Sequence, residues 1–93
     1  MRAIVLSFLA FLSPLALAKT ECTTADQTTW QDQDDFQQEL VLQGYEIKKF
    51  KVTGGNCYEI YGYDKDKRKV EIYFDPVSGK VVKHEFEDEK GGY

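Results

Sequence analysis

The pattern of apolar and polar positions changes three times along the chain. Residues 3–12 are almost entirely apolar, and residues 19–31 are polar with almost no periodicity. From Asp32 onward apolar residues return at helical spacing, and after Gly44 the period falls to two, which is typical of β-strands. The pattern therefore predicts one helix followed by several strands.

The helix is expected from Asp32 to Gln43. Three aspartates in its first turn favour the positive end of the helix dipole, and Gly44 is a typical residue just past a helix end. Apolar residues one turn apart form the stripe that faces the core. That buried stripe is expected to comprise Phe36, Leu40, Val41 and Leu42.

Strand-like runs follow, separated by turns rich in glycine, proline and charged residues. In the first run the alternation changes phase near Lys48 and Lys49. Either both faces of this strand are partly buried or a β-bulge re-aims it, and we prefer the bulge. The runs are residues 45–52, Cys57–Tyr63, Val70–Phe74 and Val81–Phe86.

One helix followed by a meander of three or four antiparallel strands is an α+β order, in which the helix packs on one face of the sheet. Successive side chains of a strand point to opposite faces. We expect Tyr58, Ile60, Gly62, Val70, Ile72 and Phe74 on the covered face, and Glu59, Tyr61, Tyr63, Glu71 and Tyr73 on the opposite face.

The first 18 residues have the composition of a cleavable secretory signal. A cationic Arg2 precedes the apolar run, and small residues ending at Ala18 offer a cleavage site. Pro14 and Lys19 shorten the run below the roughly 20 apolar residues that span a membrane. We expect export to the periplasm or the extracellular space, with no membrane insertion after cleavage behind Ala18.

Removing that segment changes the composition. The whole chain is 42% apolar with 12 basic and 16 acidic residues, but residues 1–18 hold 14 of its 39 apolar residues. The remaining 75 residues are one third apolar and carry a net charge of −5. This excludes a large multi-domain enzyme and argues against nucleic-acid binding, which needs a basic surface.

Cys22 and Cys57 are the only cysteines, so a single intramolecular pairing exists. Because export delivers the chain to an oxidising compartment, we predict a structural disulfide. It would restrict the unfolded chain by about 4 kcal/mol, a large share of the stability of so small a domain. A redox pair usually has a Cys-x-x-Cys spacing, and two cysteines with one histidine do not make a closed zinc site.

Three short motifs follow one another: LQGYEI at residues 42–47, CYEI at residues 57–60 and VEIYFDPVSGKV at residues 70–81. In this order they resemble the PepSY domain, the small module of thermolysin-type propeptides and YpeB-like proteins, in its stand-alone secreted form. The resemblance covers roughly residues 30–82. It implies a non-catalytic module that associates with peptidases and restrains them in propeptides, and it brings no catalytic residues.

The chain departs from this resemblance at the hairpin before the third run. The family commonly has glycine after the aspartate there, whereas Asp66 is followed by Lys67. The departure implies a strained turn or a longer loop. The expected organisation is a signal peptide at 1–18, an irregular arm at 19–29 pinned by Cys22, a PepSY-like domain at 30–86 and a disordered acidic tail at 87–93.

No set of residues predicts an active site. His84, the single histidine, is expected to be exposed on the last strand, and Ser78 sits in a turn without an activating partner. Asp64 and Asp66 could begin a cation-binding loop, but Arg68 occupies the third ligand position of an EF-hand-like arrangement. We therefore expect no enzymatic activity, no cofactor and no metal ion.

The remaining candidate surface is the outward face of the sheet, because tyrosine suits interfaces. The competing interpretation is that these aromatics only stabilise the sheet by cross-strand packing. Our leading hypothesis is a secreted or periplasmic monomer that binds a peptidase or another envelope protein, as an inhibitor or regulator. The alternative is a structural or sensory envelope protein that binds a small ligand on this face. The residues of the candidate surface are Tyr61, Tyr63, Tyr73, Glu59 and Glu71.

Overall fold

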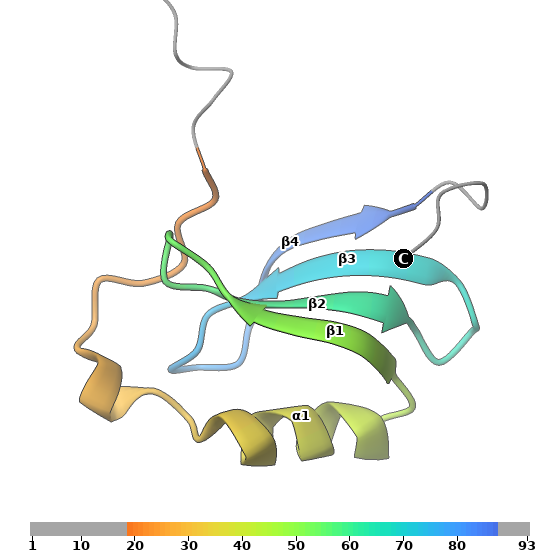
Figure 1. Cartoon of the computed structure of the whole chain (residues 1–93), viewed down its shortest axis with the longest axis horizontal. Helices are drawn as coiled ribbons and strands as arrows, with labels where there is room; N and C mark the ends of the chain where they lie inside the picture. The colour runs from red at the N-terminus through yellow and green to blue at the C-terminus, as the bar shows by residue number, and fades with distance from the viewer. Residues whose placement is uncertain (1–18, 88–93) are drawn as a thin grey trace, which may run out of the picture.

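The computed structural model describes residues 19–87, and four antiparallel strands form one sheet in the order β1-β2-β3-β4 with α1 packed on one face (Figure 1). This confirms the α+β class. The expected signal segment, 1–18, and residues 88–93 of the expected tail lie outside the described residues. No helix within residues 19–87 is long and apolar enough to cross a membrane. The elements are the 3-10 helix η2 (Gln27–Thr29), α1 (Gln33–Leu42), β1 (Glu46–Val52), β2 (Tyr58–Tyr63), β3 (Lys69–Phe74) and β4 (Val81–Phe86).

Both ends of α1 are capped as the sequence indicates. The Asp32 side chain accepts a hydrogen bond of 3.0 Å from the backbone N–H of Asp35, which satisfies one of the unpaired donors of the first turn. At the other end the Gln43 N–H donates to the Glu39 carbonyl at 3.1 Å. Gly44 follows with φ of 107°, a conformation that favours glycine. The predicted helix, 32–43, is confirmed with its caps included.

The buried stripe of α1 is narrower than predicted. Phe36 and Leu40 are buried, but Val41 is 54% exposed and Leu42 is 81% exposed. The prediction that Val41 and Leu42 extend the buried stripe is wrong. Each residue turns the helix by about 100°, so the two residues after Leu40 rotate away from the sheet. The helix therefore covers the sheet with two large side chains.

The core lies between α1 and the inner face of β2 and β3, whose residues alternate as predicted. The ring centroid of Phe36 lies 5.0 Å from that of Tyr58 and 5.1 Å from that of Phe74. Trp30 is half-buried with its ring edge-on to Tyr58 at 5.7 Å, so it anchors the segment before α1 to the core. The predicted inner-face residues are all buried: Tyr58, Ile60, Gly62, Val70, Ile72 and Phe74.

The predicted bulge in β1 is present. The register with β2 shifts between Ile47 and Lys49. The extra residue lets Ile47 and Phe50 both pack against the core although they are three positions apart. Ile47 pairs with Gly62, and a Cβ at Gly62 would overlap the carbonyl oxygen of Glu46. Only glycine therefore fits at position 62, next to the backbone of β1.

The turn between β2 and β3 is strained rather than lengthened. Lys67 has φ of 67°, the left-handed conformation that glycine would adopt more easily. Asp64 holds the turn together, because its Oδ1 accepts from the N–H groups of Asp66 and Arg68, each at 2.9 Å. The sequence predicted either a strained turn or a longer loop at this hairpin, and the strained turn is confirmed.

The disulfide between Cys22 and Cys57 is present, with a Cα–Cα distance of 5.0 Å and a sequence separation of 35. Cys57 is fully buried, and the Cys22 N–H donates to the Gly55 carbonyl at 3.0 Å. Just beyond the other end of the arm, the Tyr58 hydroxyl donates to the Gln31 carbonyl at 2.5 Å. The arm is thus fastened to the sheet at two points.

Replacing both Cys22 and Cys57 with serine should lower the free energy of unfolding by about 4 kcal/mol, because the unfolded chain regains the freedom of a long loop. Urea unfolding followed by Trp30 fluorescence measures this. Mass spectrometry should find the mature protein two hydrogens lighter than its reduced form. Two free thiols, or an unchanged unfolding midpoint, would refute the structural role.

Replacing Gly62 with alanine should destabilise the protein by about 3 kcal/mol, since the new methyl group would force β1 away from β2. The matched control is Gly54→Ala, whose Cβ meets only the flexible end of the Lys19 side chain, at 3.1 Å. That change should stay within about 0.5 kcal/mol. Equal unfolding midpoints for the two variants would contradict the close approach at Gly62.

Candidate functional site

The sheet face opposite α1 carries all five residues of the predicted surface. Glu59 lies opposite Tyr73, Tyr61 opposite Glu71, and Tyr63 opposite Lys69. β4 extends the same face, with Lys83 opposite Tyr73 and Glu85 opposite Glu71. The face thus places carboxylates, phenols and ammonium groups side by side.

Glu59 is the most unusual residue of this face, because it is only 2% exposed and its Oε2 is buried with no hydrogen-bond partner among the described residues. Burial, and then hydrogen bonding with Glu71, raise the pKa of the Glu59 carboxyl. The hydrogen bond from Glu59 lowers the pKa of Glu71. As pH rises, Glu71 therefore ionises before Glu59.

The tyrosines of this face act as donors to the two glutamates. The Tyr73 hydroxyl donates to Oε2 of Glu71 at 2.9 Å. Burial, together with the neighbouring carboxyl groups, raises the pKa of Tyr61 and of Tyr73, so both phenols keep their protons. Glu71 is consequently the ionised centre of the group.

Lysine side chains lie over the tyrosine rings. Nζ of Lys49 is 5.6 Å from the ring centroid of Tyr61, and Nζ of Lys83 is 5.6 Å from that of Tyr73. Such cation–π contacts across strands stabilise a sheet face. The three tyrosines are half-buried, and their use as a binding surface stays a prediction.

A hollow of about 400 Å³ opens at one end of this face, beside the Gly54–Gly55 turn. Glu59, Tyr61 and Tyr73 contribute to its lining, together with the side chains of three lysines. This gives a small ligand a location on the tyrosine face. The small-ligand alternative stays a prediction. The lysines of the hollow are Lys19, Lys51 and Lys83.

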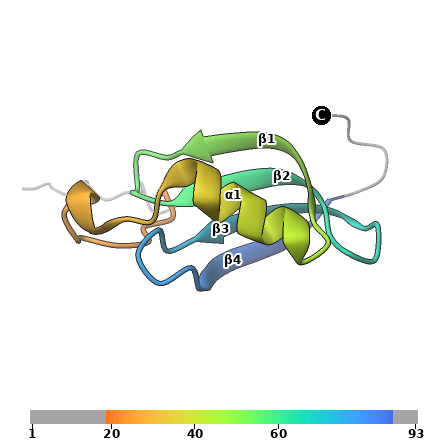
Figure 2. The same cartoon turned by 90° about the horizontal axis from the view of Figure 1, so that it is seen from below.

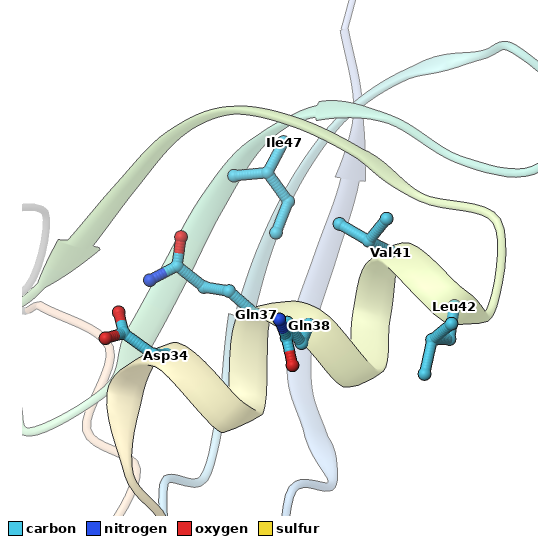
Figure 3. A pocket seen from close by; sticks show the side chains of 6 residues that line it. All are labelled: Asp34, Gln37, Gln38, Val41, Leu42 and Ile47. Carbon is cyan, nitrogen blue, oxygen red and sulfur yellow. The ribbon is translucent and has the colours of Figure 1, made fainter.

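A second hollow, of about 740 Å³, lies between α1 and β1 (Figure 3). In Figure 3 Ile47 projects from β1 toward the helix, and Val41 rises from α1 beside it. Sequence reasoning missed this groove because it assigned Val41 and Leu42 to the core. The lining residues are Asp34, Gln37, Gln38, Val41, Leu42 and Ile47.

β4 is the most exposed strand, with all six residues exposed. Figure 2 shows it along the edge of the sheet, beside the area that α1 covers. Val81, Val82 and Phe86 are 51%, 45% and 56% exposed. His84 is exposed, as expected, and its ring lies 4.6 Å from that of Phe86. The exposed apolar side chains of the edge strand β4 thus form an apolar stripe beyond the core, made of Val81, Val82 and Phe86.

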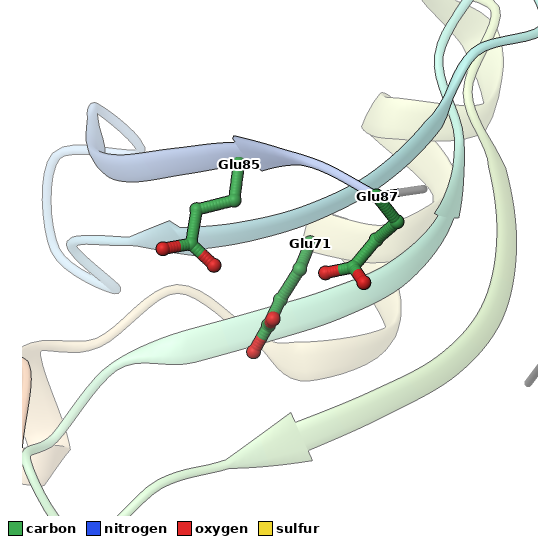
Figure 4. A group of neighbouring side chains, drawn as sticks. All are labelled: Glu71, Glu85 and Glu87. Carbon is green, nitrogen blue, oxygen red and sulfur yellow. The ribbon is translucent and has the colours of Figure 1, made fainter. Parts of the chain in front are cut away.

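Three glutamates gather where β3 and the end of β4 meet. Oxygen atoms of Glu71, Glu85 and Glu87 all lie within 4.8 Å of one another (Figure 4). In contrast, the carboxylates of Asp64 and Asp66 are both engaged by Arg68, at 3.0 and 3.4 Å. The acidic group on the sheet is therefore better placed to hold a cation than the loop weighed from the sequence.

A family model described as the peptidase propeptide and YPEB domain matches residues 2–85. The chain belongs to the PepSY family. PepSY domains are generally non-catalytic propeptide or regulatory modules, so the family associates this chain with peptidase regulation. No curated protein and no solved structure matches the chain.

The PepSY motifs of this chain build the scaffold and contain only one member of the acidic group, Glu71. The 42–47 motif ends α1 and begins β1, and the 57–60 motif supplies the centre of the core. In the third motif the Asp75 side chain accepts from the Val77 N–H at 2.7 Å, which closes the turn before β4. The family signature therefore reports the fold, and Glu85 and Glu87 lie outside all three motifs.

Replacing Glu59 with glutamine should stabilise the protein by about 1 kcal/mol at neutral pH, because glutamine keeps the shape but cannot ionise in the buried position. A carboxyl whose pKa is raised by folding stabilises the fold below its unfolded-state pKa. That contribution is lost as pH rises through the folded-state pKa. Urea unfolding in the presence of a chelator, between about pH 4 and about pH 8, measures the effect.

The control for this prediction is Glu39→Gln on the exposed side of α1, which should follow the wild type. Glu71 contributes with the opposite sign: its lowered pKa gives stability that is lost as pH falls, so the two proteins are compared above the pKa of a normal glutamate, where Glu71 is ionised in both. If the free energies of unfolding of the wild type and of Glu59→Gln change in parallel with pH above the pKa of a normal glutamate, the prediction that Glu59 carries a buried carboxyl of raised pKa is contradicted.

Proposed function

We propose that this protein is an exported, non-catalytic PepSY module that binds a peptidase along the edge strand β4 and regulates it. The observation that carries the proposal is the exposure of β4, which combines an outer edge with an apolar stripe. Among residues 19–87, no strand pairs with that outer edge. An extended segment of a partner can add to such an edge by backbone hydrogen bonds.

The two edges of the sheet differ in how they meet other chains. β1 carries three lysines and a bulge, which are devices that oppose the addition of another strand. β4 carries one lysine, Lys83, whereas Val81, Val82 and Phe86 are exposed. Strand addition is therefore favoured at β4 and disfavoured at β1.

The side chains of β4 define the partner's chemistry. Phe86 lies on the helix side of the sheet, because it pairs with the buried Val70, and Arg68 lies over its ring at 4.5 Å. The outer face of β4 presents Lys83 and Glu85 instead. A partner segment that complements β4 has alternating side chains: apolar ones on the helix side of the sheet, beside Phe86, and charged ones on the outer face. An exposed strand or loop of a peptidase can have this pattern.

Export is supported by the signal-like composition of residues 1–18 and by the disulfide, since disulfides persist in oxidising compartments. Cleavage after Ala18 leaves a chain that starts at Lys19, three residues before the cysteine that pins the arm. The mature protein is proposed to act as a monomer in the periplasm or outside the cell.

Binding of mature protein, residues 19–93, to purified exported peptidases of the source and to a thermolysin-type peptidase tests the proposal. We expect a complex in calorimetry and slower cleavage of a peptide substrate. Val82→Lys should weaken binding at least about tenfold, because it places a charge on the docking edge. Leu42→Lys is the matched control, since Leu42 is exposed on α1 away from β4.

The absence of a complex with every peptidase would rule out the peptidase-binding function. A complex that is weakened by Leu42→Lys and untouched by Val82→Lys would move the docking site to the groove between α1 and β1. Thermal melting of both variants verifies that each remains folded before binding is measured.

A further inference from the structure

We infer that the outer edge of β4 pairs with β4 of a second copy of this chain, which joins two sheets into one. Within residues 19–87 no strand pairs with this edge, and the side chains of Val81, Val82 and Phe86 are about half exposed. Figure 2 shows no helix or strand of the described residues beyond β4. The two copies would run antiparallel about a two-fold axis that passes through His84.

The backbone of β4 restricts how a second copy can pair. The Glu87 N–H donates to the Lys69 carbonyl of β3 at 2.8 Å, so the Phe86 carbonyl, in the same peptide unit, points to the outer edge. In an antiparallel ladder this direction alternates from one residue to the next. The N–H and C=O groups of His84 and Phe86 therefore point to the outer edge, whereas those of Glu85 point to β3. Two such edges exchange hydrogen bonds only where outward-pointing residues meet.

Side-chain charges select one register among those that the backbone allows. With His84 opposite His84 of the second copy, Lys83 lies opposite Glu85 and Val82 lies opposite Phe86. The next allowed register on either side brings Lys83 opposite its own counterpart, or Glu85 opposite its own counterpart. Opposite charges directly across two strands stabilise a pairing, and like charges destabilise it. β4 is thus complementary to itself in the register centred on His84.

The apolar side chains of β4 match in the same register. Phe86 lies on the helix side of the sheet, because it pairs with the buried Val70. Val82 of the second copy would arrive beside Phe86 and remove part of both side chains from water. The irregularity of β4 lies between Val81 and Lys83, so residues 83–86 keep a regular register with β3. The pairing therefore buries apolar surface that a single copy leaves exposed.

The outer face has an excess of negative charge that a second copy would reduce. Carboxylate oxygens of Glu71, Glu85 and Glu87 lie within 4.8 Å of one another. Within one copy, Nζ of Lys83 lies 3.5 Å from Glu85. The two-fold axis places Lys83 of the second copy opposite the same Glu85, so four charges alternate in sign across the junction. Exposed ion pairs add little affinity, so the charges fix the register, while the backbone and Phe86 hold the copies together.

The contact is small, because one strand of six residues meets one other strand. Such an interface belongs to the weak, transient class, which dissociates on dilution. β4 cannot pair with a second copy and with a peptidase at the same time. Self-pairing would therefore cover the docking edge at high concentration, and the monomer would stay the form that binds a peptidase. This last consequence rests on the proposed function.

Sedimentation velocity of mature protein, residues 19–93, between about 1 µM and about 1 mM tests the pairing. We expect the average sedimentation coefficient to rise with concentration toward that of a dimer and no further, because a two-fold contact is closed. Lys83→Glu alone and Glu85→Lys alone should each weaken the dimer at least about tenfold, since each places like charges opposite each other.

A mixture of the two variants is the decisive sample. In a mixed pair the new glutamate of one copy faces the new lysine of the other, and the remaining Glu85 faces the remaining Lys83. The mixture should therefore associate as the wild type does. Lys51→Glu and Glu39→Lys are the matched controls, because they change the net charge equally at exposed positions of β1 and α1. Each control alone should dimerise as the wild type does, and thermal melting verifies that every variant is folded.

Three results would overturn the inference. One is a wild type that stays monomeric at the highest concentration. Another is a dimer that persists equally in Lys83→Glu and in Glu85→Lys, because the contact would then lie elsewhere. The third is a mixture of these two variants that fails to associate. None of these samples contains a peptidase, so failure of the self-pairing and failure of the proposed function remain distinguishable.

Discussion

Among the described residues, a helix of ten residues is the only element that covers the inner face of a four-stranded sheet. The helix is too short to cover all four strands, and the rest of the structure depends on this shortage of cover. Phe36 and Leu40 bury the centre of β2 and β3, where all the inward residues are excluded from solvent. A core built on so few side chains gives limited hydrophobic stabilisation. The disulfide compensates by restricting the unfolded chain, and Trp30 seals the end of the core that α1 does not reach.

The same shortage acts differently on the two sides of the sheet. On the inner side it leaves β4 uncovered, so that apolar residues such as Phe86 remain at the surface. On the outer side, among residues 19–87, tyrosine rings and lysine stems take the place of a second layer. They cover the middle strands closely enough to bury Glu59, an acid in a position that sheet geometry alone would leave in water. The raised pKa of Glu59 follows from that burial.

Local chemistry made much of this fold predictable. The caps of α1, the phase change in β1, the inward set of β2 and β3 and the single cysteine pairing each depend on a few neighbouring residues. Leu42 was misplaced because periodicity shows which residues are apolar and not where the sheet beneath them ends. The acidic group was missed because bringing Glu71 to Glu85 requires the register between two strands. The burial of Glu59 depends on how long side chains pack over the sheet, which alternation does not encode.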